Sequence, residues 1–163
     1  MISDNTLTDS VFCAPAGAAG EGAVDLFGLT ISGNTFPTTG PIFDTGNVPF
    51  ILRNSIVDEP ERTLGAGADQ TFDRVMVNTP AAVLPEGVFR GVPIFNYIGG
   101  AAVQTEASPG VDAAICDVGA VDGDGNPRNV DLPEVNNGPG PCDLGAFETP
   151  ASAGSLVFRD GFE

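Results

Sequence analysis

The amino-acid sequence predicts an all-β fold, and three observations favour this class. Short apolar runs alternate with turn residues, and the 163 residues include 22 glycines and 14 prolines. No window repeats apolar residues at the three- and four-residue spacing of a helix. The apolar share of 42% is too high for a disordered chain. The length suits one domain with a real core.

A short motif recurs along the first third of the chain. It consists of an aliphatic residue, an Asn three positions later, a Thr or Ser, and a bulky apolar residue, and its copies begin at Ile2, Ile31 and Ile51. The copies are separated by roughly 20 to 30 residues, as in a solenoid. Each copy is too short to bury its apolar face alone, so stacking is expected. We predict a right-handed parallel β-helix of few coils, with Asn5, Asn34 and Asn54 forming a ladder at one corner.

Strands are predicted in four segments, which are Val24–Ser32, Phe50–Val57, Phe72–Val77 and Val88–Tyr97. The Ala/Gly/Pro-rich segment 14–22 is predicted to be a loop that bulges from a corner. A β-sandwich and an irregular β-domain are the alternative folds.

The chain divides into three predicted parts. Residues 1–110 form β-helix coils with loop insertions, residues 111–149 form a loop-rich C-terminal cap, and residues 150–163 form a linker and a tail. A cap over the last coil is expected because the open end of a parallel stack exposes apolar side chains and unpaired strand edges. For the same reason, the edge at residues 1–9 predicts self-association of the isolated chain.

The charge balance excludes several classes of function. Six arginines face 22 acidic residues, giving a net charge of -16, and the chain has no Lys and no His. It therefore repels nucleic acid. Without His or Lys there is no imidazole base, Schiff-base lysine or imidazole metal ligand. No catalytic site is predicted. Asp58, Glu59 and Glu61 fall in a predicted loop, and an arginine base at Arg53 or Arg74 stays an alternative.

The three cysteines give information on the cellular compartment in which the protein resides. Cys116 and Cys142 bracket a Gly/Pro/Asp-rich loop and predict a disulfide in an oxidising environment, which leaves Cys13 without an assigned partner. Three reduced thiols are the alternative. No stretch reaches the ~20 apolar residues of a transmembrane helix. The first residues lack the features of a signal peptide, so we expect a piece of a longer exported protein.

Two polar constellations are candidates for a site. Asp122, Asp124 and Asn126 alternate with glycines, as at the start of a calcium loop, although a structural turn is the alternative. Calcium is the one cofactor that the sequence suggests. Arg128 follows this turn and is predicted to pair with Asp143 or Glu148 inside the cap, because a guanidinium can bind a carboxylate bidentately.

The C-terminal region resembles a known module. Ser108-Pro109 with Asp112, then Asp124-Gly-Asn-Pro-Arg128, then Asp143-Leu-Gly-Ala-Phe-Glu148 resemble the end of bacterial secreted β-helix proteins called choice-of-anchor Q domain proteins. The last residues, Phe158-Arg-Asp-Gly-Phe-Glu163, resemble a short tail of exported Gram-negative proteins.

The resemblance implies a secreted or cell-surface β-helix protein of a Gram-negative bacterium. The expected role is non-catalytic, as a structural or surface-display end with a possible adhesive contact to a polysaccharide or cell-surface component. The alternative is a polysaccharide-binding or polysaccharide-degrading β-helix whose groove lies partly upstream. The absence of Trp and the single Tyr weigh against that alternative.

Overall fold

The computed structural model describes residues 1–3, 12–13, 22–36, 40–67, 69–79, 81, 83–98, 101–135 and 138–150. Predictions for Asn5, for most of the segment 14–22 and for the tail from residue 151 lie outside these residues, as does the side chain of Cys13. No helix occurs in the described ranges, and hence none that could cross a membrane.

Nine parallel-paired strands precede an antiparallel hairpin. In chain order they are β1 (Ile2–Ser3), β2 (Phe12–Cys13), β3 (Val24–Phe27), β4 (Thr30–Ser32), β5 (Pro41–Gly46), β6 (Phe50–Asp58), β7 (Thr63–Gly67), β8 (Gln70–Asn78), β9 (Val88–Arg90), β10 (Phe95–Ile98) and β11 (Ala101–Gln104). Strands β1 to β9 pair in parallel, whereas β10 and β11 form an antiparallel hairpin.

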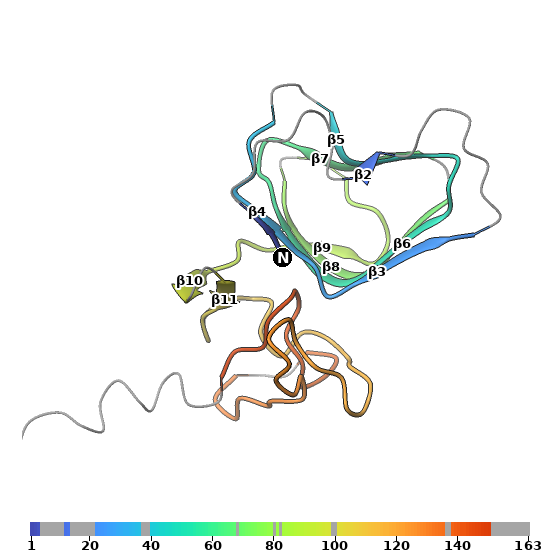
Figure 1. Cartoon of the computed structure of the whole chain (residues 1–163). Helices are drawn as coiled ribbons and strands as arrows, with labels where there is room; N and C mark the ends of the chain where they lie inside the picture. The colour runs from blue at the N-terminus through green and yellow to red at the C-terminus, as the bar shows by residue number, and fades with distance from the viewer. Residues whose placement is uncertain are drawn as a thin grey trace, which may run out of the picture.

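The chain alternates between two parallel sheets that face each other (Figure 1). One sheet has the order β1-β4-β6-β8-β9, with β3 also paired to β6, and the other has the order β2-β5-β7. Each passage from one sheet to the other and back places the next strand beside its predecessor. The all-β prediction with parallel strands is thus confirmed.

A column of left-handed residues bends the larger sheet. Gly28, Asn54, Arg74 and Gly87 have φ values of 64°, 47°, 53° and 76°, and the strand register aligns all four in neighbouring strands. Glycine adopts this conformation without steric cost, and Asn tolerates it better than other residues do. This left-handed column separates β3 from β4 and creates a bend at the same point in β6 and β8.

The bend also changes which alternate positions face inward. In β6, Phe50 and Leu52 precede Asn54 and lie in the core between the two sheets, and Val57 lies in the same core beyond it. Ile56 instead packs outside the sheet. A regular strand would keep even-numbered residues on one face throughout. The left-handed residue therefore shifts the alternation by one position.

The inner core is a stack of aliphatic and aromatic side chains from successive strands. Its fully buried members include Ile31, Phe43, Phe50, Leu52 and Val75, and the Phe43 and Phe50 rings have centroids 4.9 Å apart. Burial of such side chains contributes about 1.5–3 kcal/mol each.

The predicted strands agree with the structure in part. Phe50–Val57 and Phe72–Val77 lie within β6 and β8. Val24–Ser32 is divided at Gly28, and Val88–Tyr97 contains β9 and β10 separated by four residues. Strands β5, β7 and β11 were not predicted, because their Gly, Pro and Ala residues resemble turn sequence.

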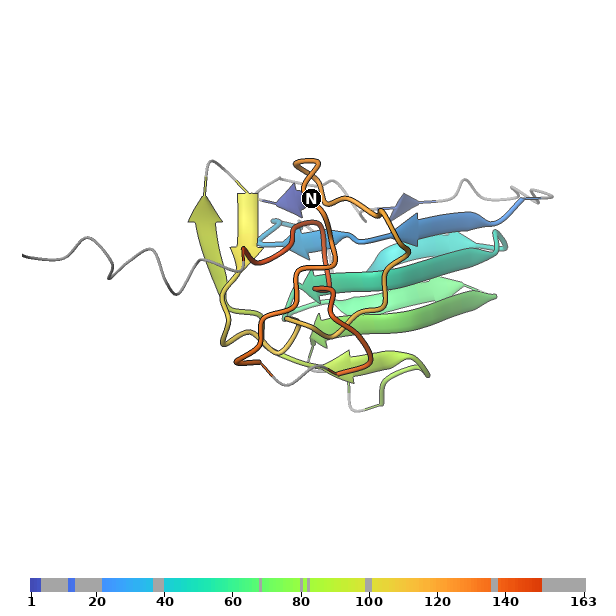
Figure 2. The same cartoon turned by 90° about the horizontal axis from the view of Figure 1, so that it is seen from below.

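Residues 105–150 carry no strand in their described part and consist of turns, bends and two isolated β-bridges. The position of this segment differs from the prediction, however. Figure 2 shows this segment running across the larger sheet, along the direction in which its strands are stacked. Its apolar partners there are Ile56 and Met76, the side chains that the bend turns outward. We call residues 111–149 the side module.

Candidate functional site

The side module is fastened to an outward stripe of the larger sheet. The stripe consists of Thr30, Ile56 and Met76, which the register places in one row. The Thr30 hydroxyl accepts a hydrogen bond from the Ala146 N–H at 2.9 Å, and Leu144 packs on Ile56 and Met76. Apolar burial and backbone hydrogen bonds therefore hold the module together with the sheet.

Asn54 of the left-handed column joins both parts. Its carbonyl accepts the Gly145 N–H at 2.8 Å, and its side-chain amide donates to the Ile115 carbonyl at 2.7 Å. Asn54 thus adopts a left-handed conformation and forms hydrogen bonds to the side module.

The predicted asparagine ladder is wrong for Asn34 and Asn54. The register places Ile31 beside Val57 and places Asn54 between Gly28 and Arg74. The third motif copy therefore lies on the other side of the bend. Asn34 bonds Glu59 instead, through its N–H at 3.0 Å and its amide at 2.7 Å, and also reaches the Ile2 carbonyl at 3.1 Å.

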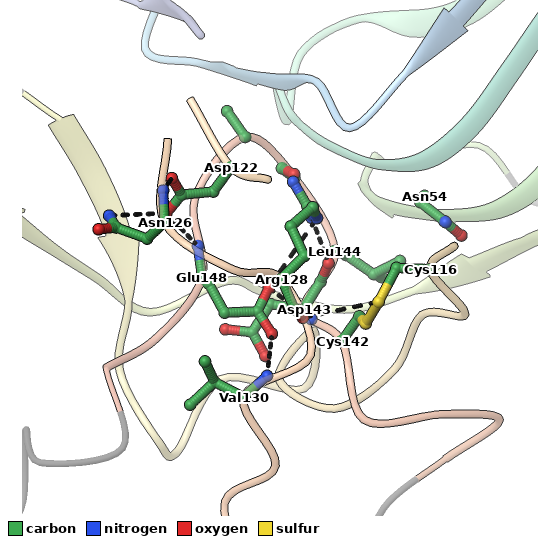
Figure 3. Close-up of polar contacts among 12 residues, drawn as sticks. Asn54, Cys116, Asp122, Asn126, Arg128, Val130, Cys142, Asp143, Leu144 and Glu148 are labelled. Carbon is green, nitrogen blue, oxygen red and sulfur yellow. Dashed lines mark hydrogen bonds and ion pairs between the residues drawn. A yellow bond between two sulfur atoms is a disulfide. The ribbon is translucent and has the colours of Figure 1, made fainter. Parts of the chain in front are cut away.

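Arg128 lies at the centre of the module and is 3% exposed (Figure 3). One terminal nitrogen donates to the carbonyls of Asp143 and Gly145 at 2.7 and 2.8 Å. Its Nε lies 3.9 Å from a Glu148 carboxyl oxygen, which is too far for a hydrogen bond. Arg128, Asp143 and Glu148 do lie together, but the guanidinium binds backbone carbonyls where a bidentate carboxylate pair was predicted.

The two carboxylates hold the backbone of the module. Asp143 accepts the N–H groups of Asp112 and Thr149 at 2.9 and 2.7 Å. Glu148 accepts those of Asp143 and Val130 at 3.3 and 3.4 Å. Burial raises the pKa of Asp143. Burial, with the nearby Asp143 charge, raises the pKa of Glu148 to about 8.

Asp122 closes a tight turn. One carboxylate oxygen accepts the N–H groups of Asp124 and Asn126 at 2.9 and 2.8 Å, and the other accepts from the Asn126 amide and the Glu148 N–H, both at 3.3 Å. Burial alone would raise the pKa of Asp122, but these hydrogen bonds outweigh it and lower the pKa. Both oxygens thus serve backbone and amide donors. No cluster of three acidic or Cys side chains with metal-binding geometry occurs among the described residues.

A disulfide joins Cys116 and Cys142, as predicted (Figure 3). Cys142 is fully buried beside Ile56 and Met76, so the bond closes the module directly over the outward stripe. The enclosed loop carries both the Asp122 turn and Arg128. By the loop-entropy estimate the bond contributes about 3 kcal/mol.

A cavity of about 660 Å³ is lined by segments 32–36 and 58–62 and by Tyr97. It contains Asp58, Glu59 and Glu61, the acidic residues that the sequence assigned to a loop. Glu59 is 5% exposed, and burial raises its pKa although Asn34 donates two hydrogen bonds to it. Sequence reasoning missed Tyr97, because its contribution depends on how the hairpin β10–β11 sits beside the sheet.

Comparison with protein-family models, with curated proteins and with solved structures gives no match for this chain.

Proposed function

We propose that this chain is the C-terminal part of a right-handed parallel β-helix protein that acts as a structural, non-catalytic end of a secreted or cell-surface molecule. The observation that carries the proposal is the alternation of strands between two parallel sheets in register, with a loop-rich module fastened to the side of the stack. Each passage of the chain is then one coil.

The chemistry of the side module supports a structural role. Arg128, Asp143 and Asp122 direct their polar atoms at backbone groups of the same module. Such contacts fix loops in one conformation, since buried polar groups need partners. A catalytic group instead needs a reactive atom that faces a substrate.

The disulfide supports export. Disulfides persist in oxidising compartments such as the periplasm or the cell exterior. A net charge of -16 also favours a protein whose copies stay dispersed, because like-charged molecules repel each other. We propose surface display, with adhesion to a cell-surface component as its use.

The test is co-sedimentation of the purified chain with insoluble neutral and acidic polysaccharides, with and without calcium, while supernatants are assayed for reducing and unsaturated sugar ends. The structural proposal expects no sugar release under any condition. Released sugar ends would contradict it and favour a polysaccharide-degrading protein. Binding without release would favour the adhesive form of the proposal.

A further inference from the structure

We propose that the cavity between segments 32–36 and 58–62 is a docking site for a Lys or Arg side chain presented by a partner protein. The proposal adds a partner chemistry to the structural role and does not depend on that role, because it rests on this cavity alone.

The lining of the cavity offers an exposed aromatic ring. Tyr97 is 62% exposed on the hairpin and lines the cavity together with Phe36. The Arg62 guanidinium lies 4.2 Å from the centroid of the Phe36 ring, so the lining of the cavity already holds one cation–aromatic contact within the chain. An exposed aromatic face at a cavity attracts a further cation, because the ring carries negative charge on its faces.

The lining of the cavity also offers carboxylates. Glu61 is exposed and Asp58 is half-buried, and both line the cavity. Asp58 is held in place by the amide of Asn78 at 2.8 Å. Arg62 also lines the cavity, but it is 5% exposed and donates to the Pro41 carbonyl at 3.2 Å. The charges that face the opening are therefore mainly negative.

Complementarity of charge selects the occupant. With a net charge of -16 and no Lys, a second copy of this chain is repelled and offers few cations. Anionic saccharides and nucleic acid are repelled as well. A neutral saccharide could stack on Tyr97, but it would gain nothing from the carboxylates' charge. A side chain with an apolar stem and a cationic head can contact the ring and the carboxylates at once.

The test is calorimetric titration of the whole chain with a pentalysine peptide at low salt. The variants Glu61→Gln and Tyr97→Ala change exposed groups, so the fold is retained, as circular dichroism will check. Glu134→Gln removes the same charge at an exposed position of the side module, and Ile98→Ala truncates a 59% exposed neighbour of Tyr97. These two variants are the matched controls.

We expect the peptide to bind, and we expect Glu61→Gln and Tyr97→Ala each to weaken binding by about two- to fivefold. The two controls should bind as the unchanged chain does. Absence of peptide binding would overturn the proposal. Weakening of binding by Glu134→Gln as large as that by Glu61→Gln would also overturn it, because it would show that the peptide is attracted by the overall charge and not by the cavity. Binding of a neutral hexasaccharide that Tyr97→Ala abolishes, without peptide binding, would also overturn it and would identify a saccharide site. None of these outcomes bears on sugar release, so the structural proposal is tested separately.

Discussion

At the residue scale, Glu148 is the most unusual titratable group of the side module. It is 5% exposed, its carboxyl lies 3.9 Å from the Arg128 Nε, and its pKa is about 8. The pKa in the folded chain is above the value of 4.5 expected without the fold. Protonation therefore favours the folded state, and stability from this group decreases as pH rises from about 4.5 to about 8.

We predict that Glu148→Gln removes this part of the pH dependence. For the unchanged chain, the free energy of unfolding should fall by on the order of 3 kcal/mol between pH 5 and pH 8.5 because of this one group. Chemical denaturation of both proteins at the two pH values measures the difference. Because Asp112 and Asp143 remain in both proteins, the difference between them isolates Glu148. Parallel pH profiles would show that Glu148 is ionised in the folded chain.

Asp122 leads to a prediction on metal removal. Its two carboxylate oxygens already accept hydrogen bonds from Asp124, Asn126 and Glu148. We expect the melting temperature to be the same in EDTA and in millimolar calcium. Differential scanning calorimetry checks this, with magnesium as the control ion. A rise specific to calcium that Asp124→Asn abolishes would restore the calcium site predicted from the sequence.

At the scale of elements, the left-handed column determines how each strand of the larger sheet bends. Arg74 is the member with the least suitable side chain, since a left-handed conformation costs about 1 kcal/mol for a residue with a Cβ. Its salt bridge to the neighbouring Asp73 lies at the partly exposed surface, where such pairs contribute little.

We therefore predict that Arg74→Gly stabilises the chain by about 1 kcal/mol. Arg53→Gly is the matched control, because Arg53 is also a half-buried strand residue that pairs with an aspartate, but it lies outside the column. It should destabilise the chain by about 1 kcal/mol, because Gly in an extended strand has a high entropic cost. Urea denaturation of the two variants measures both effects. Destabilisation by both would mean that residue 74 is not left-handed in solution.

The same column explains what the sequence could predict and what it could not. Strands β6 and β8 were identified because Phe50–Val57 and Phe72–Val77 are rich in Ile, Val and Phe. The alternation of inward-facing and outward-facing side chains within these strands was not predicted, because the shift at Asn54 and Arg74 follows from backbone conformation. Arg74 gives no sequence signal for a left-handed position. The predicted alignment of the motif copies was wrong for this reason, since Ile51 precedes the bend whereas Ile31 follows it.

At the scale of the whole molecule, the sequence identified the module's residues but not its place. Cys116 was predicted to bond Cys142, and it does. Arg128 was predicted to pair with Asp143 or Glu148, and these three residues lie together. Their location on the side of the sheet depends on Ile56 and Met76 facing outward, which again follows from the bend. The cavity beside Tyr97 was missed because it joins three separate segments of the chain.

The disulfide couples the module to the stack. We predict that reduction lowers the melting temperature and raises binding of a dye for exposed apolar surface, because loosening the loop uncovers Ile56 and Met76. The loss of stability should be about 3 kcal/mol. The variant Cys116→Ala with Cys142→Ala should behave like the reduced chain and be insensitive to reductant. An unchanged melting temperature after complete reduction would contradict this coupling.

The most direct test of the central claim, a parallel stack with a module fastened to its side, is amide hydrogen exchange of the oxidised and reduced chain. The Gly145 and Ala146 amides bond the Asn54 carbonyl and the Thr30 hydroxyl. In the oxidised chain they should be protected together with the amides of β6 and β8. After reduction they should exchange faster while β6 and β8 stay protected. Free exchange of Gly145 and Ala146 in the oxidised chain, with β6 and β8 protected, would show that the module is not fastened there and would contradict the claim.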